Sequence, residues 1–309
     1  MSEKLKFLRD KLEKIPFDEW PDYIEKAGYE VPYKYLEKLK GIPVREIPFK
    51  QLEKLLKRAG YKFPSKKLRK LKEKYGDKFP DHVGLIIDGN RRWAKKRGLD
   101  ANAGHYKGYE TLRKILFTHG DIGIKYLSIY TLSIENIKKR DPEEIKYLYD
   151  LIIRIADDLI SEKNENKERV RFNVFGRLSI VPPEVRDKLN ELVEETKENE
   201  EFFINLCIAY DGQAEIVDAI KAILSNSKVD PQNVTPQLIK KYLYTKGYPE
   251  LDYIVRTGMK DGARISGFLL WDASYSEFKF RDDYWPDYNE KMLTKDLKEY
   301  IKRNRRKGK

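Results

Sequence analysis

The segment HVGLIIDGNRRWAKKRG, residues 82–98, contains the transition that decides the fold. Residues 83–87 form a continuous apolar run, which is typical of a strand buried on both faces of a parallel sheet. The run ends at Asp88, and Gly89 and Asn90 follow it before two arginines at the start of a predicted helix. A strand, a polar turn and a helix in this order predict the first unit of an α/β fold.

The same alternation continues toward the C-terminus. Further apolar runs predict strands at 126–132, 170–175, 202–209 and 253–255. Helical patterns predict helices at 109–118, 142–161, 183–197, 213–224 and 236–244. We therefore predict an α/β fold with a central parallel sheet flanked by helices and covered on both faces. Ligands of such sheets bind beyond the carboxyl ends of the strands, so the polar residues after each strand are the candidate site residues.

Residues 1–78 show a different pattern, an internal repeat. Residues 24–40, IEKAGYEVPYKYLEKLK, and 56–72, LKRAGYKFPSKKLRKLK, are identical at nine of 17 positions. In each copy a helical pattern ends at Gly28 or Gly60, and Pro32 or Pro64 can start the next helix. We predict a small all-α N-terminal region of about four short helices. The predicted domains are therefore 1–78 and 79–309.

The composition excludes several classes of protein. The 309 residues suffice for one α/β domain and a small addition to it. No apolar run approaches the roughly 18 residues needed to span a bilayer, and the charged N-terminus lacks the apolar segment of a secretory signal. The single cysteine, Cys207, excludes a disulfide scaffold and lies in an apolar run, which predicts a buried structural thiol. We expect a soluble protein of the cytoplasm.

The positive charge is concentrated at the two ends of the chain. The formal net charge is +12, of which residues 1–80 contribute +9, while 301–309 carry six basic side chains and no acidic one. One interpretation is a solvated helical surface. The other is attraction to an anionic partner, either membrane lipid or nucleic acid. The sequence contains no base-reading motif, so peripheral association with an anionic membrane is favoured over nucleic acid.

Asp88 lies where a phosphate and metal site is expected. The glycine after it lets a ligand approach the backbone, and the start of the following helix favours an anion. A carboxylate is a hard oxygen ligand of the kind that Mg²⁺ prefers, usually together with substrate phosphates. The alternative is an ordinary turn between a strand and a helix.

Residues 82–98 also resemble the opening motif of the cis-prenyltransferase family, the undecaprenyl or dehydrodolichyl diphosphate synthases. The resemblance covers about residues 80–309 and leaves 1–78 outside. It continues through GH at 104–105, LSIEN at 132–136, RTG at 256–258, RIS at 264–266, FLLW at 268–271, SE at 276–277 and WPD at 285–287. It implies a Mg²⁺-dependent enzyme that condenses isopentenyl diphosphate with an allylic prenyl diphosphate and forms a cis-polyprenyl diphosphate.

The resemblance further implies a role for each matching residue. Asp88, Ser133 and Asn136 would be catalytic, and Asp88 and Glu277 would be the carboxylates of the Mg²⁺ site. The residues implied to bind the allylic diphosphate are Gly89, Asn90, Arg92, Trp93 and His105. Those implied to bind the diphosphate of isopentenyl diphosphate are Arg256, Arg264 and Ser266. Arg306 and Gly308 match a C-terminal Arg-x-Gly that reaches the site of a partner subunit, which implies a homodimer or a heteromer with a homologue.

Several positions depart from the family pattern. Ala101 and Ile137 occupy places where the family has arginine and tryptophan, residues 209–213 read AYDGQ instead of NYGGR, and the loop after Arg256 is about two residues longer. Three interpretations stay open. The chain is a divergent elongating synthase, a prenyltransferase with a non-elongating acceptor, or a non-catalytic scaffold that binds membrane through its basic N-terminal region. Retention of Asp88 and Asn136 favours an active enzyme.

Overall fold

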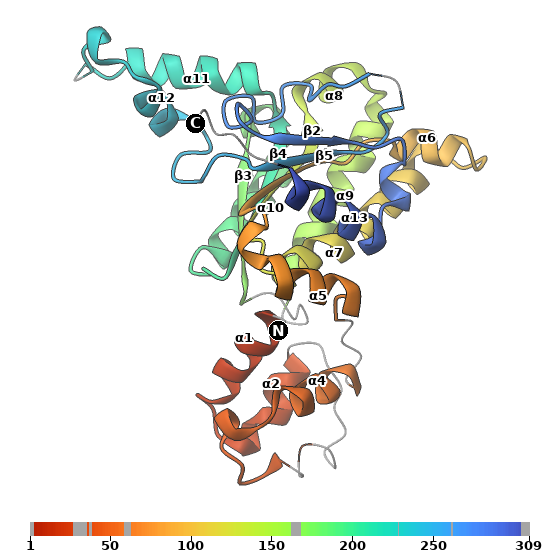
Figure 1. The fold of residues 1–309 in the computed structure, drawn as a ribbon. Helices are drawn as coiled ribbons and strands as arrows, with labels where there is room; N and C mark the ends of the chain where they lie inside the picture. The colour runs from red at the N-terminus through yellow and green to blue at the C-terminus, as the bar shows by residue number, and fades with distance from the viewer. Residues whose placement is uncertain are drawn as a thin grey trace.

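A computed structural model of the chain describes residues 3–26, 36, 39–58, 63–161, 168–227, 229–260 and 262–303. These residues form one six-stranded sheet in the order β3-β4-β2-β1-β5-β6, and all of its neighbouring strands are parallel (Figure 1). The strands are β1 (His82–Ile86), β2 (Tyr126–Ser133), β3 (Val170–Phe175), β4 (Phe202–Tyr210), β5 (Tyr253–Arg256) and β6 (Glu277–Phe280). The predicted central parallel sheet is confirmed.

Five strands were expected from the sequence, and β6 is the addition. This strand has four residues, EFKF, none of which is fully buried, and it lies at the edge of the sheet beside β5. A short edge strand of this kind lacks the long apolar run that predicts the buried strands.

One face of the sheet carries the larger core. The helices that contribute to it are α5 (Lys66–Tyr75), α7 (Ala101–Asp121), α9 (Pro142–Ile160), α10 (Pro183–Thr196) and α13 (Glu290–Lys302). Their buried side chains pack against strand residues such as Leu85, Ile129 and Ile204, each at most 1% exposed. Because helix and strand side chains meet in one continuous cluster, this face provides most of the apolar burial that stabilises the domain.

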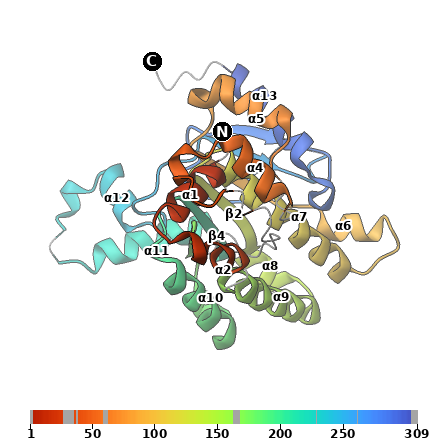
Figure 2. The ribbon, with the colours of Figure 1, turned by 90° about the horizontal axis from the view of Figure 1, so that it is seen from below.

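The opposite face carries a smaller core. Ile86, Cys207 and Ile254 from the strands pack against side chains from residues 244–273, including Phe268. The thiol of Cys207 is buried as predicted, and burial raises its pKa well above the usual value. Helices α11 (Gly212–Leu224) and α12 (Pro236–Tyr242) pack on each other and extend to one side of the sheet (Figure 1, Figure 2).

The N-terminal region has a core of its own. Helices α1 (Glu3–Leu12), α2 (Trp20–Lys26) and α4 (Phe49–Arg58) form a separate lobe below the sheet in Figure 1. The buried side chains of this lobe are Leu8, Leu12, Trp20, Ile24, Leu36, Leu39, Val44, Ile47, Leu52 and Leu55. Gly28, Pro32 and Gly60 lie outside the described residues. No helix in the described ranges is long and apolar enough to cross a membrane.

Helix α5 belongs with the larger core although it precedes residue 78. Leu68 and Leu71 are buried in the cluster that contains β1, and the Ser65 N–H donates to Glu290 of α13 at 2.7 Å. The small lobe makes its own contacts: Lys11 Nζ lies 2.8 Å from Glu168, and the guanidinium of Arg169 lies 5.7 Å from the ring of Phe7. Residue 169 directly precedes β3, so the small lobe contacts the N-terminal edge of the sheet.

Candidate active site

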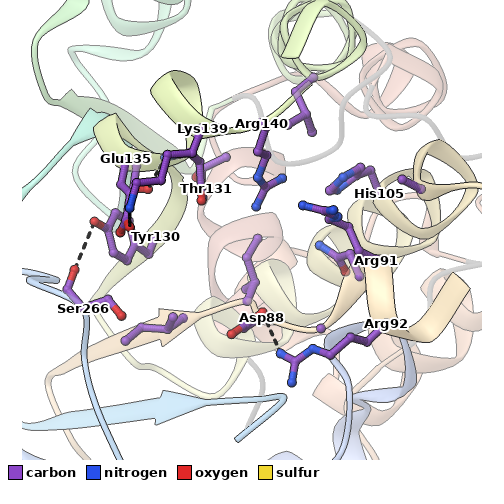
Figure 3. A pocket seen from close by; sticks show the side chains of 18 of the residues that line it. Asp88, Arg91, Arg92, His105, Tyr130, Thr131, Glu135, Lys139, Arg140 and Ser266 are labelled. Atoms are coloured by element: carbon purple, nitrogen blue, oxygen red, sulfur yellow. Dashed lines mark hydrogen bonds and ion pairs between the residues drawn. The ribbon is translucent and has the colours of Figure 1, made fainter. Parts of the chain in front are cut away.

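A pocket of about 830 Å³ opens at the carboxyl ends of β1, β2 and β5. Figure 3 shows its side chains converging from the strand ends and the helices that follow them. Ten of the predicted site residues line it: Asp88, Gly89, Asn90, Arg92, His105, Ser133, Asn136, Arg256, Arg264 and Ser266. They come from segments up to 178 residues apart, and the parallel register brings them to one edge.

Asp88 is held between two arginines. Its Oδ1 lies 3.0 Å from Nη2 of Arg92, and its Oδ2 lies 3.1 Å from Nη2 of Arg256. The backbone carbonyl of Asp88 accepts hydrogen bonds from Thr257 Oγ1 at 2.8 Å and from the Trp285 N–H at 3.0 Å. The carboxylate is 35% exposed, so it is fixed in direction and still accessible from the pocket.

Two close approaches shape the turn after Asp88. Gly89 has a φ of +108°, and a Cβ at this position would lie 2.7 Å from the ring of Tyr284. Asn90 is the first residue of α6 (Asn90–Lys95), and its side chain packs against Gly108 of α7. A Cβ at residue 108 would lie 2.5 Å from Oδ1 of Asn90. Both glycines are therefore required for this turn to sit against its neighbours.

Arg256 also organises the opposite wall of the pocket. Its Nη1 donates to the carbonyl of Arg264 at 2.8 Å and to Oγ of Ser266 at 2.9 Å. Ser266 has a φ of +50°, a strained conformation for a residue with a side chain. The hydroxyl of Tyr130 donates to the Ser266 carbonyl at 3.3 Å, so two side chains hold this strained residue in place.

The α6 side of the pocket contains a cluster around Glu144 of α9. Its Oε1 accepts from His105 Nε2 at 3.0 Å and from Arg140 Nη1 at 2.9 Å, and its Oε2 lies 3.7 Å from Nε of Arg91. Burial is the main cause that lowers the pKa of His105, which favours the neutral imidazole. Burial, with the neighbouring Arg91 charge, also lowers the pKa of Arg140.

Ser133 and Asn136 lie where β2 passes into α8 (Ile134–Lys139). The Ser133 hydroxyl caps this helix by accepting from the Asn136 N–H at 3.0 Å. Both residues line the pocket, and the capping bond fixes their relative position.

Two predicted residues lie outside the pocket of their own chain. Trp93 lies on α6 and contacts the Trp-Pro-Asp turn. Its Nε1 donates to Asp287 Oδ1 at 2.8 Å. Glu277 is the first residue of β6 and pairs in register with Tyr253, the first residue of β5. It therefore lies at the edge of the sheet opposite to Asp88, and the chain does not bring the two predicted metal ligands together. Its Oε2 contacts Arg303 Nη1 at 2.6 Å. Arg306 and Gly308 lie outside the described residues.

Several pocket residues were missed from the sequence: Arg91, Lys95, Tyr130, Thr131, Glu135, Lys139, Arg140 and Asp211. Arg91 and Lys95 lie in the same RRWAKK segment as Arg92. Arg92 was predicted to bind a diphosphate, so the two neighbouring cations could have been predicted to line the same site. Asp211 directly follows β4 and caps α11 through the Ala214 N–H at 2.9 Å. The rule that polar residues after a strand line the site applies to it as well.

A cation-rich pocket at the carboxyl edge of a parallel sheet is suited to a ligand that carries phosphate groups. The profile of the family described as putative undecaprenyl diphosphate synthase matches residues 86–308. The chain belongs to this family, the cis-prenyltransferases, and is a prenyltransferase.

The similar proteins carry corresponding names. An isoprenyl transferase of Fusobacterium nucleatum is 41% identical over 227 residues, which are 74% of this chain and 95% of that protein. A tritrans,polycis-undecaprenyl-diphosphate synthase (geranylgeranyl-diphosphate specific) of Pyrococcus abyssi is 39% identical over 230 residues, 74% of this chain and 86% of that one. The crystal structure of lavandulyl diphosphate synthase from Lavandula x intermedia with dimethylallyl diphosphate is 28% identical, with a TM-score of 0.71 over 75% of this chain and all of that chain.

Proposed function

We propose that this chain catalyses the Mg²⁺-dependent condensation of isopentenyl diphosphate with an allylic prenyl diphosphate, giving a cis-polyprenyl diphosphate. The observation that supports this most directly is the Asp88 carboxylate between Arg92 and Arg256 in the pocket. The names of the related isoprenyl transferase and undecaprenyl diphosphate synthase support chain elongation.

The two walls of the pocket suit two diphosphates. The allylic diphosphate is assigned to the α6 wall, formed by Gly89, Asn90, Arg92 and His105. The diphosphate of isopentenyl diphosphate is assigned to the wall formed by Arg256, Arg264 and Ser266. Each substrate carries several negative charges, and convergent guanidinium groups bind such oxygens through charge-assisted hydrogen bonds.

The reaction breaks the bond between the allylic C1 and its diphosphate oxygen and forms a bond from C1 to C4 of isopentenyl diphosphate. A proton leaves C2 of the isopentenyl unit, and diphosphate leaves with the electron pair of the broken bond. Arg92 stabilises the charge that develops on the departing diphosphate. Ser133 and Asn136, which also line the pocket, orient the isopentenyl unit for loss of the proton.

The Asp88 carboxylate is suited to one ligand position of a Mg²⁺ ion. Asp88 offers a pocket-facing carboxylate, and Mg²⁺ commonly takes one or two carboxylates and completes its shell with phosphates and water. When bound, Mg²⁺ supplies positive charge to the leaving diphosphate. Asp88 would hold the ion, and Arg92 and Arg256 beside it would contact phosphate oxygens.

A partner subunit accounts for Glu277 and for the C-terminal tail. Arg303 connects Glu277 with the start of the C-terminal tail. We assign Glu277 and the tail residues Arg306 and Gly308 to one surface that completes the pocket of a second copy in a homodimer. Glu277 would then serve the metal site of the partner.

The basic N-terminal region is assigned to peripheral binding of anionic membrane, because residues 1–80 carry +9, of which 1–62 supply +4 and 63–80 supply +5, and each exposed cation near such a surface contributes about 1 kcal/mol before screening. The test compares the full chain with a chain that lacks residues 1–62, using vesicles with anionic phosphatidylglycerol. The full chain should sediment with the vesicles, less so at high salt, and the shortened chain, which loses +4 of this charge, should sediment to a smaller extent. Equal sedimentation of the two chains would refute this assignment.

The experiment for the catalytic proposal uses purified protein, Mg²⁺, labelled isopentenyl diphosphate and all-trans allylic diphosphates, including geranylgeranyl diphosphate. A labelled product soluble in organic solvent is expected, and chelation of Mg²⁺ should abolish it. Chromatography of the product then distinguishes repeated elongation from a single condensation. No product with any primer would contradict the proposal and favour the scaffold interpretation.

A further inference from the structure

A second cavity, of about 670 Å³, lies beside the edge strand β3, on the face of the sheet that carries the smaller core. Its floor comes from β2, β3 and β4, and its walls come from residues 244–248 and from α10. Among the described residues, it shares no lining side chain with the pocket at the carboxyl edge. A volume of this size is typical of sites for small molecules, so the cavity can hold a ligand of its own.

The floor places a cation beside flat rings. Arg171 of β3 pairs in register with Phe203 of β4, and Phe203 pairs with Tyr126 of β2. Residues in register point to the same face of a sheet, so these three side chains form one row. The rings of Tyr126 and Phe203 stack with their centroids 5.0 Å apart and an interplanar angle of 19°. Tyr248 approaches both rings edge-on from the wall, at 6.1 Å and 6.0 Å between centroids.

A chain of hydrogen bonds fixes the neighbouring row of the floor. Asn173 Nδ2 donates to Asn205 Oδ1 at 3.0 Å, and Asn205 Nδ2 donates to Ser128 Oγ at 3.0 Å. The same Ser128 Oγ lies 2.7 Å from His82 Nε2, and His82 Nδ1 lies 2.8 Å from the Pro249 carbonyl oxygen. These bonds run from the floor of the cavity to the end of the segment that forms its wall. The cavity is therefore shaped before a ligand binds.

The charged side chains that line the cavity are all cations. Among the described lining residues they are Arg171 and Lys246, and no carboxylate is present. Within the described part of the chain, neither cation forms an ion pair. A third cation, Lys125, lies beside the floor, with its Nζ 5.6 Å from the ring of Tyr126 and 5.7 Å from the ring of Phe203. Positive charge that no acidic group balances attracts an anionic ligand.

We propose that this cavity binds a free nucleoside monophosphate. The base stacks on the rings of Tyr126, Phe203 and Tyr248, because flat aromatic rings favour an aromatic partner. The phosphate contacts Arg171 and Lys246 through charge-assisted hydrogen bonds. A single strand of nucleic acid would need a basic groove that follows its backbone, and two lining cations suit one phosphate better. This site is independent of the function proposed for the other pocket.

Calorimetry with adenosine monophosphate tests the proposal. The titration contains Mg²⁺ and excess inorganic pyrophosphate, which competes for the cation-rich pocket at the carboxyl edge. Saturable binding of the nucleotide is expected under these conditions. Adenosine and ribose phosphate, tested separately, should each bind at least about tenfold more weakly, because each lacks one of the two contacts. No saturable binding, or displacement of the nucleotide by pyrophosphate, would refute the proposal.

Single substitutions locate the bound phosphate. Lys246→Ala and Arg171→Ala should each weaken nucleotide binding about tenfold, the effect of losing one charged hydrogen bond. Lys241→Ala is the matched control, because Lys241 is an exposed cation of α12 that does not line the cavity, and its loss should change the affinity less than twofold. Lys246 is exposed, so its substitution leaves the fold intact. Equal affinities of all three variants would contradict the assigned phosphate contacts.

The aromatic contact is tested in the same way. Tyr248→Ala should weaken binding of adenosine monophosphate about tenfold and leave the weak binding of ribose phosphate within twofold. Its control is Tyr275→Ala, since Tyr275 is 70% exposed and does not line the cavity. Melting temperatures separate loss of binding from loss of folding. Tighter binding of a single-stranded oligonucleotide than of the mononucleotide would assign the surface to nucleic acid and refute the proposal.

Discussion

Arg256 and Asp88 are separated by 168 residues in the sequence, and Arg256 Nη2 lies 3.1 Å from Asp88 Oδ2. The sheet sets this contact, because Arg256 pairs in register with Ile86, two residues before Asp88, across the parallel strands β5 and β1. The other guanidinium nitrogen of Arg256 holds the strained Ser266. One side chain therefore joins the turn that carries the carboxylate proposed to hold Mg²⁺ to the wall assigned to isopentenyl diphosphate.

Arg256→Lys should lower kcat/KM for isopentenyl diphosphate by about 10²-fold. An ammonium group cannot reproduce the forked contacts to Asp88, Arg264 and Ser266. Steady-state kinetics with each substrate varied in turn provide the measurement. The KM for isopentenyl diphosphate should rise more than the KM for the allylic primer, and equal changes would mean that the two walls are not separate.

The C-terminal tail should act on the partner subunit. Deleting residues 304–309 should weaken substrate binding, and mixing this chain with an Asp88→Ala chain should restore activity. In the mixed dimer, one pocket has both Asp88 and the tail of its partner. An activity no greater than the sum of the two separate chains would show that the tail does not act across subunits.

Glu277 should also act on the pocket of the partner subunit. A Glu277→Gln chain mixed with an Asp88→Ala chain should also recover activity, since one mixed pocket receives Glu277 from the Asp88→Ala chain. Failure of this mixture, alongside success of the tail mixture, would separate Glu277 from the metal site.

The position of the boundary between the N-terminal lobe and the catalytic domain affects the melting temperature of shortened chains. Deleting residues 1–78 removes Leu68 and Leu71 from the larger core, and each buried leucine contributes on the order of 2–5 kcal/mol. Deleting residues 1–62 keeps helix α5. Thermal unfolding should show a much lower melting temperature for the first deletion than for the second. Equal melting temperatures would mean that α5 does not stabilise the catalytic domain.

The sequence predicted the parts of this structure that depend on local pattern. Long apolar runs located five strands, and the rule that ligands bind beyond strand ends located Asp88, while Ser133 came from the family resemblance. The edge strand β6 was missed because four alternating residues give a weak periodic signal. Trp93 was assigned to substrate from its motif, but its partner Asp287 is 194 residues away, and only tertiary packing reveals this contact.

The cluster around Glu144 could not be predicted from the sequence. Arg91, His105 and Glu144 come from α6, α7 and α9, and no local pattern relates them. Trp20 illustrates the same limit in the small lobe. It is 2% exposed and donates to the Leu12 carbonyl at 3.2 Å, which makes it a core residue.

His119 should make the protein less stable in acid. Its Nδ1 contacts the Ile115 carbonyl at 2.7 Å, Nε2 is buried without a partner among the described residues, and burial lowers its pKa to about 4. The unfolded chain, with a histidine pKa near 6.5, binds the proton first as the pH falls. The folded state therefore loses up to about 3 kcal/mol between pH 6.5 and 4.

Urea unfolding at pH 7.5 and pH 4.5 measures this effect. His82 and His105 also have lowered pKa values, so they add to the same trend. His119→Leu should reduce the difference in the free energy of unfolding between the two pH values. An unchanged difference would show that His119 does not take part in the acid response.

The most direct test of the central claim is the turnover of Asp88→Asn in the assay with labelled isopentenyl diphosphate, Mg²⁺ and an allylic diphosphate primer. The substitution keeps the shape of the side chain and removes the charge that would bind the metal beside the leaving diphosphate. We predict a loss of turnover of about 10²-fold or more with an unchanged melting temperature. Turnover within tenfold of the unmodified enzyme would contradict the account.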